Sequence, residues 1–289
     1  MNNLEYNSLD KSEYPFKSNY YQSKYGKVHY IDEGKGEVLL FLHGTPAWSF
    51  LYRNYIKELS TNYRCIAIDH LGFGLSDKNK DFEGTPQAHN KILEEFITNL
   101  DLININLIVH DFGGVIGLPY AINHPENINK LVIFNTWLWE TKSNKDVVKV
   151  GKILNSAIGK FMYLNLNFSP KVLFKKAFYD KNKLSKSIHK QYILPFPNKN
   201  SRYGLLKIGQ SLLASSDWYQ ANWEKIDKIK DKNILFLWGV KDEFIKVDFL
   251  NKWESTFTNK KVVRYDAGHF VQEEFPKETI SEIKKFLEG

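Results

Sequence analysis

The stretch Leu107-Ile108-Val109-His110-Asp111-Phe112-Gly113-Gly114 decides the fold of this 289-residue chain. An apolar run leads through a reactive side chain and small residues into a helix-like segment. This order is the pattern of a nucleophile elbow, a strained turn that lifts one side chain above a sheet. Gly113 and Gly114 permit the close approach of helix and strand that such a turn needs. The sequence therefore predicts that Asp111 is a nucleophile.

Other short apolar runs lie on both sides of this stretch and alternate with segments of helical periodicity. The runs that are nearly continuous in apolar character are residues 38–42, 65–68, 107–109, 131–134 and 234–238. Runs of this kind are typical of strands that are covered on both faces of a parallel sheet. We therefore expect an α/β fold with a mostly parallel central sheet and flanking helices.

The alternation stops between residues 136 and 231, where aromatic residues and lysines recur at helical spacing and no strand-like run occurs. We interpret this stretch as an inserted helical cap at about 136–216, and the core as about 27–135 and 217–289, within a single domain 1–289. Insertions of this kind lie above the carboxyl ends of the strands, where α/β sheets bind their ligands.

An aspartate at the elbow changes the chemistry that is available there. A serine hydroxyl must lose its proton as it attacks, whereas a carboxylate with an ordinary pKa of about 4 is already ionised at neutral pH. Asp111 can therefore attack an sp3 carbon without a base. The resulting alkyl ester must then be hydrolysed by water that a base activates.

Two further residues complete a predicted catalytic triad. His269 follows the strand-like segment 261–265, and Asp242 follows the run 234–238. The order nucleophile, acid, histidine is the order found in α/β-hydrolases. The backbone N–H groups of Thr45, after the run 38–42, and of Phe112 are expected to form an oxyanion hole.

With these residues in place, the chain resembles the haloalkane dehalogenases from about residue 27 to 286. The resemblance is carried by residues 43–53 (HGTPAWSFLYR), 69–78 (DHLGFGLSDK), 109–118, 192–197 (YILPFP) and 266–273. It implies Asp111 as the nucleophile, His269 as the base and Asp242 as the acid. In one subgroup of the family a Glu takes the place of the acid, at a position that corresponds to Asn135 here, which carries no charge.

The sequence departs from this family at the residues that hold the departing halide. The residue after the nucleophile is normally Trp, and the position of Thr45 is Asn in many members, whereas this chain has Phe112, which has no side-chain donor. Other donors are available, and we expect Thr45 to contribute to leaving-group binding. The candidate pocket residues are Trp48, Trp137 and Trp139.

Four functions are compatible with these residues. Hydrolytic dehalogenation is the first, and epoxide hydrolysis by the same machinery is the second. Epoxide hydrolysis also needs cap tyrosines to protonate the opening oxygen, for which the candidates are Tyr163, Tyr179, Tyr192 and Tyr203. The third is β-lactone decarboxylation, which relatives with a similar Val-His-Asp elbow perform. A silent binding protein or sensor on the same fold is the fourth.

Composition and charge indicate which partners and which cellular location to expect. The formal net charge is +7, but the lysines are mixed with Glu and Asp, for example in residues 225–232, so we expect no nucleic-acid partner. No apolar run reaches the roughly 18 residues of a membrane span, and we expect a cytoplasmic protein, monomeric or homodimeric. The predicted partners are a small apolar substrate and water, with no cofactor and no metal, since no paired ligand spacing occurs.

Overall fold

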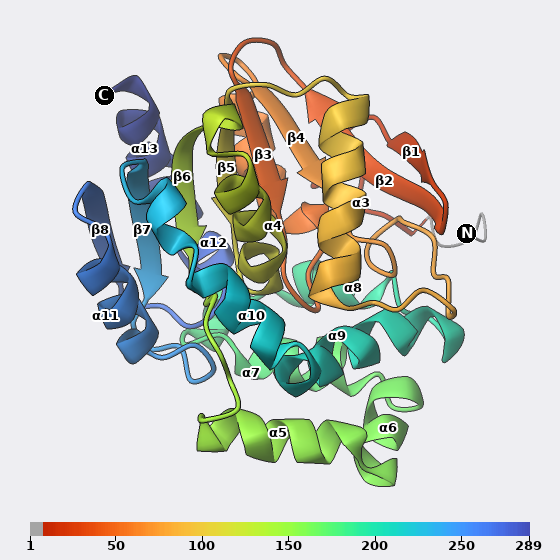
Figure 1. Cartoon of the computed structure of the whole chain (residues 1–289). Coiled ribbons are helices and arrows are strands. Elements are labelled where there is room, and N and C mark those ends of the chain that lie inside the picture. The colour runs from red at the N-terminus through yellow and green to blue at the C-terminus, as the bar shows by residue number, and fades with distance from the viewer. Residues whose placement is uncertain (1–7) are drawn as a thin grey trace.

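The centre of the molecule is an eight-stranded sheet with the strand order β1-β2-β4-β3-β5-β6-β7-β8 (Figure 1). The computed structural model describes residues 8–289. The strands are β1 (Asn19–Ser23), β2 (Gly26–Glu33), β3 (Val38–Leu42), β4 (Arg64–Ile68), β5 (Ile105–Val109), β6 (Ile128–Phe134), β7 (Asn233–Gly239) and β8 (Lys260–Tyr265). The pairs from β4 and β3 through to β8 are parallel, whereas β2 is antiparallel to both of its neighbours. The predicted mostly parallel sheet is confirmed.

The apolar runs of the sequence lie on the central strands. The run 38–42 coincides with β3, and the others are contained in β4 to β7, which extend a few residues beyond them. The hairpin of β1 and β2 had no such run. Its strands are only partly buried, so they mix polar and apolar residues and carry a weaker signal.

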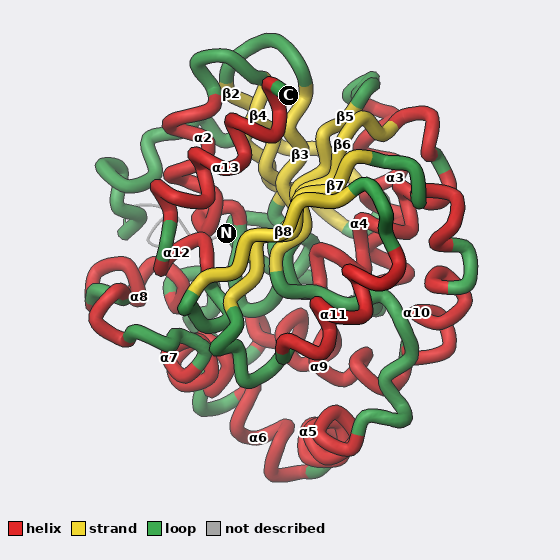
Figure 2. The backbone as a smooth tube through the Cα atoms, turned by 90° about the vertical axis from the view of Figure 1, so that its left-hand side faces the viewer, coloured by secondary structure: helices red, strands yellow, loops and turns green. Residues whose placement is uncertain are grey.

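Helices cover both faces of the sheet (Figure 2). One face is covered by α2 (Arg53–Leu59), α12 (Val271–Glu274) and α13 (Pro276–Glu288), and the other by α3 (Pro86–Asn99), α4 (Phe112–Asn123) and α11 (Val247–Thr256). Successive residues of a strand point to opposite faces, so Leu40 and Leu42 of β3 enter one hydrophobic cluster, and Leu39 and Phe41 the other. This double burial explains why the central strands are apolar at every position.

The chain between β6 and β7 is helical. Its helices are α5 (Lys145–Asn155), α6 (Ala157–Leu164), α7 (Phe174–Lys176), α8 (Lys186–Ile193), α9 (Tyr203–Ala214) and α10 (Ser216–Trp223). Short 3-10 turns lie at Ser49–Tyr52, Pro125–Asn127, Lys181–Lys183, Asn200–Arg202 and Ile226–Ile229, and a π-helical turn at Ser169–Leu173. We refer to residues 136–216 as the cap. In Figure 1, α5, α6, α7 and α9 gather at one end of the sheet, below it in this view.

A buried polar network fastens the cap to the core. Arg53 of α2 forms a bidentate ion pair with Glu273, and the hydroxyl of Tyr192 on α8 donates to the same carboxylate. Charged groups are stable in the interior only when they are paired in this way. The indole N–H of Trp48 adds a 3.2 Å hydrogen bond to the carbonyl oxygen of Gln191. Within residues 8–289, no helix is long and apolar enough to cross a bilayer.

Candidate active site

Asp111 stands at the turn between β5 and α4 with a strained backbone. Its φ of 51° and ψ of −126° lie in a region that non-glycine residues rarely occupy. Two bonds hold this conformation, one from the Asp111 N–H to the carbonyl oxygen of Asn135 (2.9 Å), and one from the Thr136 hydroxyl to the Asp111 carbonyl oxygen (2.6 Å). A Cβ on Gly113 would lie 2.2 Å from the carbonyl oxygen of Leu42, so only glycine fits there.

The carboxylate of Asp111 is kept ionised although it is buried. Burial by itself raises the pKa of this group, but hydrogen bonding to His269 and the charge of His269 outweigh it, and the pKa falls below its ordinary value. The backbone N–H of Thr45 donates to Oδ1 of Asp111 over 2.8 Å, and the N–H of Phe112 also donates to the carboxylate. One oxygen is thus held by the chain, and the other faces the histidine.

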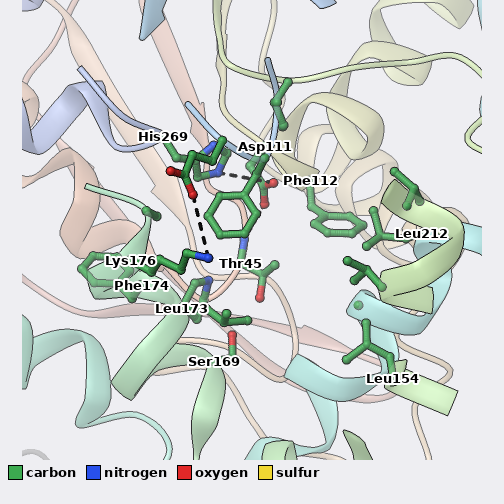
Figure 3. A pocket seen from close by; sticks show the side chains of 18 of the residues that line it. Thr45, Asp111, Phe112, Leu154, Ser169, Leu173, Phe174, Lys176, Leu212 and His269 are labelled. Carbon is green, nitrogen blue, oxygen red and sulfur yellow. Dashed lines mark hydrogen bonds and ion pairs between the residues drawn. The ribbon is translucent and has the colours of Figure 1, made fainter. Parts of the chain in front are cut away.

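His269 lies between two carboxylates. Its Nδ1 is 2.7 Å from Oδ2 of Asp242. Its Nε2 faces Asp111, 3.5 Å from Oδ2 of that residue (Figure 3). Burial lowers the pKa of the imidazole, but Asp242 and Asp111 more than compensate and raise it to about 10. The two carboxylates therefore favour the protonated imidazolium form of His269.

Asn135 holds the carboxylate of Asp242 in place. Its side-chain nitrogen donates to Oδ2 of Asp242 over 3.0 Å, and its oxygen accepts from the N–H of Gly239 over 2.9 Å. The N–H of Phe244 donates to the other oxygen of Asp242 over 2.7 Å. The side chain of Asp242 is fully buried, and these donors compensate for its loss of water. The sequence had indicated only that Asn135 carries no charge.

The facing side chains of Asp111 and His269 lie at the wall of a cavity of about 450 Å³ between core and cap (Figure 3). Its lining is mostly apolar and includes, from the cap, Val147, Val150, Ile153, Leu154, Met162, Tyr163, Phe168, Leu173, Phe174 and Leu212. From the core it includes Thr45, Pro46, Phe112, Phe244, Ile245, Phe249 and Phe270. A cavity of this size and polarity suits a small apolar ligand. Within residues 8–289, no cluster of three or more His, Cys, Asp or Glu side chains could hold a metal ion.

Two of the three tryptophans predicted as pocket candidates are located elsewhere. Trp48 is buried beneath the cap. Its ring stacks on Phe50, and its indole N–H donates to the carbonyl oxygen of Gln191. Trp139 packs among Trp223, Trp253 and Phe249, with the ammonium of Lys252 4.4 Å from its ring centroid. Neither contributes to the described lining of the cavity, so the expectation for both was wrong.

Trp137 does line the cavity, with its ring edge-to-face against Phe112 at 5.0 Å between centroids. Its indole nitrogen and the hydroxyl of Thr45 are buried and have no hydrogen-bond partner in the described part of the chain. A buried donor without a partner costs roughly 1–3 kcal/mol, and a bound ligand relieves this cost. These two groups are therefore the unused donors of the cavity wall.

The four candidate tyrosines do not converge on Asp111. Tyr163 is part of the cavity lining, and burial raises its pKa to about 12. Tyr192 instead binds Glu273, and Tyr179 is 56% exposed. Tyr203, at the start of α9, also lies outside the described lining of the cavity. A pair of tyrosines, which would protonate an opening epoxide oxygen, is therefore not present in the described lining.

Comparisons with known proteins place the chain in a family. The family model described as "alpha/beta hydrolase fold" matches residues 37–276. The chain is 34% identical to a cis-3-alkyl-4-alkyloxetan-2-one decarboxylase of Shewanella oneidensis, over 94% of this chain and 89% of the relative. It is 30% identical to haloalkane dehalogenase 2 of Mycobacterium tuberculosis, over 92% of this chain and 93% of the relative.

Solved structures show the same likeness. The haloalkane dehalogenase DatA of Agrobacterium tumefaciens C58 superposes with a TM-score of 0.84 at 25% identity, covering 94% of this chain and 96% of that one. The fold is thus that of an α/β hydrolase. The chain belongs to the α/β-hydrolase fold family, in the branch that contains the haloalkane dehalogenases and the oxetanone decarboxylases.

The charge of Asp242 is expected to control the protonation of His269. In an Asp242→Asn variant, the imidazole keeps a polar neighbour but loses the nearer negative charge, so the pKa of His269 falls. An NMR titration of the histidine ring protons measures this change. Asp266→Asn, which alters an exposed carboxyl in the neighbouring loop, is the matched control. An unchanged His269 titration in Asp242→Asn would contradict the assignment of the acid.

Proposed function

We propose that this protein is a hydrolase that cleaves the carbon–halogen bond of small apolar alkyl halides through a covalent ester on Asp111. The observation that carries the proposal is an ionised carboxylate, held by two backbone N–H groups and a histidine, in the wall of an apolar cavity. The proposed catalytic residues are Asp111, His269 and Asp242. The reaction needs water and no cofactor.

In the first step, Oδ2 of Asp111 attacks the carbon that bears the halogen. A carbon–oxygen bond forms, the carbon–halogen bond breaks, and the halide departs with the bonding electron pair. Oδ1 stays bound to the Thr45 N–H and becomes the carbonyl oxygen of the ester. The apolar lining removes water from the carboxylate and makes it a stronger nucleophile than in bulk solvent.

The first step also prepares the base for the second. Esterification removes the negative charge of Asp111, which is one of the two charges that raise the pKa of His269. The pKa of the imidazole therefore falls, and Nε2 releases its proton to solvent water, so a halide ion and a proton leave after the first step. Nε2 can then take a proton from a water that attacks the ester carbonyl, while the N–H groups of Thr45 and Phe112 stabilise the oxyanion. When this intermediate collapses, the bond between the acyl carbon and the alkyl oxygen breaks, and the proton on Nε2 passes to that oxygen to give the alcohol. The carboxylic acid left on Asp111 then gives its proton to His269, which restores the carboxylate and the imidazolium.

The leaving halide is assigned to the two unused donors of the cavity wall. Phe112 offers no side-chain donor, whereas the Thr45 hydroxyl and the Trp137 indole N–H are buried without a partner in the described part of the chain. A halide in an apolar cavity needs such donors because it has lost its water. We assign leaving-group binding to Thr45 and Trp137 on this basis.

A second function, β-lactone decarboxylation, is favoured by a specific observation. The oxetanone decarboxylase of Shewanella oneidensis is 34% identical to this chain, and Phe112 has no donor for a free halide. When Asp111 attacks the alkyl carbon of a lactone ring, the leaving carboxylate remains attached to the substrate. Loss of CO2 with expulsion of Asp111 then forms the alkene, so neither a separate anion nor water is required.

We further propose that residues 1–289 form a single domain with a cap over the carboxyl ends of the strands. We also propose that the protein is cytoplasmic and is a monomer or a homodimer. The cap supplies more than half of the described cavity lining, so it is the part of the chain that would select the substrate.

A substrate panel tests the proposal directly. Purified protein is expected to release bromide from short bromoalkanes, and Asp111→Asn is expected to reduce the release to background because the variant has no nucleophile. Bromide is measured in solution, with diol formation from epoxides and CO2 release from β-lactones as parallel assays. Bromide release that persists in Asp111→Asn would refute the nucleophile, and CO2 release without bromide release would select the second function.

Removal of the Trp137 N–H is expected to affect dehalogenation alone. Trp137→Phe keeps an aromatic ring against Phe112 but loses one hydrogen bond to the leaving halide, which should lower kcat/KM for bromoalkanes about tenfold. Trp139→Phe, outside the described cavity lining, is the control and should behave like the parent protein. An equal loss in both variants would argue against halide binding by Trp137.

His269→Gln is expected to stop the dehalogenation cycle at the ester. The variant should release about one equivalent of bromide and gain the mass of the alkyl group, because no base activates water. Intact-protein mass spectrometry detects this product. Continued alcohol formation over many turnovers would refute the mechanism. The β-lactone reaction uses no water, so it should continue in the same variant.

A further inference from the structure

The positive charge of this protein is concentrated in the cap. Residues 136–216 contain 15 Lys and Arg but only 3 Asp and Glu, which gives a net charge of +12. The other 208 residues contain 25 basic and 30 acidic residues, a net charge of −5. The even mixture of charges seen in residues 225–232 thus describes the core and not the cap. A separation of this size creates an electrostatic field directed through one part of the surface.

Most cap lysines point into solvent without a carboxylate partner. Thirteen of them are exposed. Within the described residues only two form ion pairs, Lys142 with Asp217 and Lys176 with Glu243 at 3.8 Å. The cap residue Asp146 is itself paired with Lys246 over 2.8 Å. The acidic groups near the cavity therefore do little to neutralise the surface.

The same region exposes apolar side chains. Nine of the eleven large hydrophobic side chains that are exposed in the described chain lie on the cap or at residues 244–247. Helices α5 and α6 alone carry Val150 (42% exposed), Ile153 (47%), Ile158 (71%) and Phe161 (53%). Exposed apolar groups in such a cluster indicate an interaction surface.

This surface includes the entrance of the cavity. Val150 and Ile153 of α5 and Phe244 after β7 are exposed and also line the cavity. Lys176 of α7 and Glu243, in the loop that carries Asp242, also line the cavity and form an ion pair (Figure 3). An apolar compound that leaves the face of α5 can thus enter the cavity directly.

We propose that the face formed by α5, α6 and residues 244–247 docks on an anionic membrane surface, from which apolar substrate reaches the cavity. Lysines next to exposed apolar side chains are the combination that interfacial helices use, with attraction to anionic headgroups and insertion of the apolar groups at the boundary. Nucleic acid would use the lysines but leave the apolar groups uncovered. Two copies of this face would repel each other, since each cap carries +12.

Vesicle co-sedimentation of the full chain tests this proposal. The protein should bind vesicles of equal parts phosphatidylcholine and phosphatidylglycerol at low salt, and bind pure phosphatidylcholine at least about tenfold more weakly. Binding should be lost at about 1 M salt, where charges are screened within about 3 Å. The measurement needs no turnover, so its outcome is independent of the reaction proposed above.

Matched variants locate the surface. Lys152→Glu with Lys160→Glu should weaken binding to the mixed vesicles about tenfold or more, whereas Lys91→Glu with Lys228→Glu, on the core, should not. Ile158→Ser should weaken it further, whereas Ile103→Ser, 67% exposed at the opposite end of β5, should have no effect. Circular dichroism confirms that each variant is folded.

Three outcomes would overturn the proposal. The first is equal binding to the two kinds of vesicle. The second is equal loss in the cap and core variants. The third is that Ile158→Ser leaves vesicle binding unchanged, while one of two other results is seen. Either the parent protein binds a short DNA duplex tightly, or the Ile158→Ser substitution converts a dimer of the protein to a monomer. The surface would then be a general polyanion site or a contact between copies.

Discussion

The structure depends on keeping the carboxylate of Asp111 ionised in a place from which water is largely removed. Burial opposes the charge, and the compensation comes from three directions, namely the N–H groups of Thr45 and Phe112 and the imidazolium of His269. Each belongs to a different loop at the carboxyl ends of the strands. The strand order, which brings β3, β5, β7 and β8 into one sheet, is what makes these loops converge. The proposed reactivity of Asp111 follows from this arrangement.

The cap has two physical roles in the protein. It closes the apolar cavity, and the buried Arg53, Glu273 and Tyr192 network holds it against the core. It also carries the positive charge of the molecule. By closing the cavity, the cap leaves little water around the proposed nucleophile. In the docking proposal, the positive charge of the cap brings the cavity entrance to an anionic membrane, which is a source of apolar compounds. Both follow from one inserted helical segment.

The leaving group is where the two proposed functions diverge. A halide must be held after it departs, and this chain replaces the usual indole donor with the ring of Phe112. Trp137, edge-to-face with Phe112, brings an indole N–H to the same wall from the end of β6. A lactone carboxylate stays on its substrate and makes no such demand. The chemistry of one side of the cavity therefore separates the two candidates, whereas the nucleophile serves both.

The sequence by itself determined the sheet and the order of the proposed triad. Strands buried on both faces must be apolar at nearly every position, and the elbow needs small residues after Asp111, as the contact of Gly113 with Leu42 shows. Only the tertiary structure decided which aromatic side chains line the cavity. Trp48, Trp137 and Trp139 are alike in sequence, but Trp48 is buried under the cap and Trp139 packs against Trp223 and Trp253 of the core. The tertiary structure also showed that Asn135 holds Asp242 in place. The sequence could not show this contact, because residues at the ends of distant strands leave no local pattern.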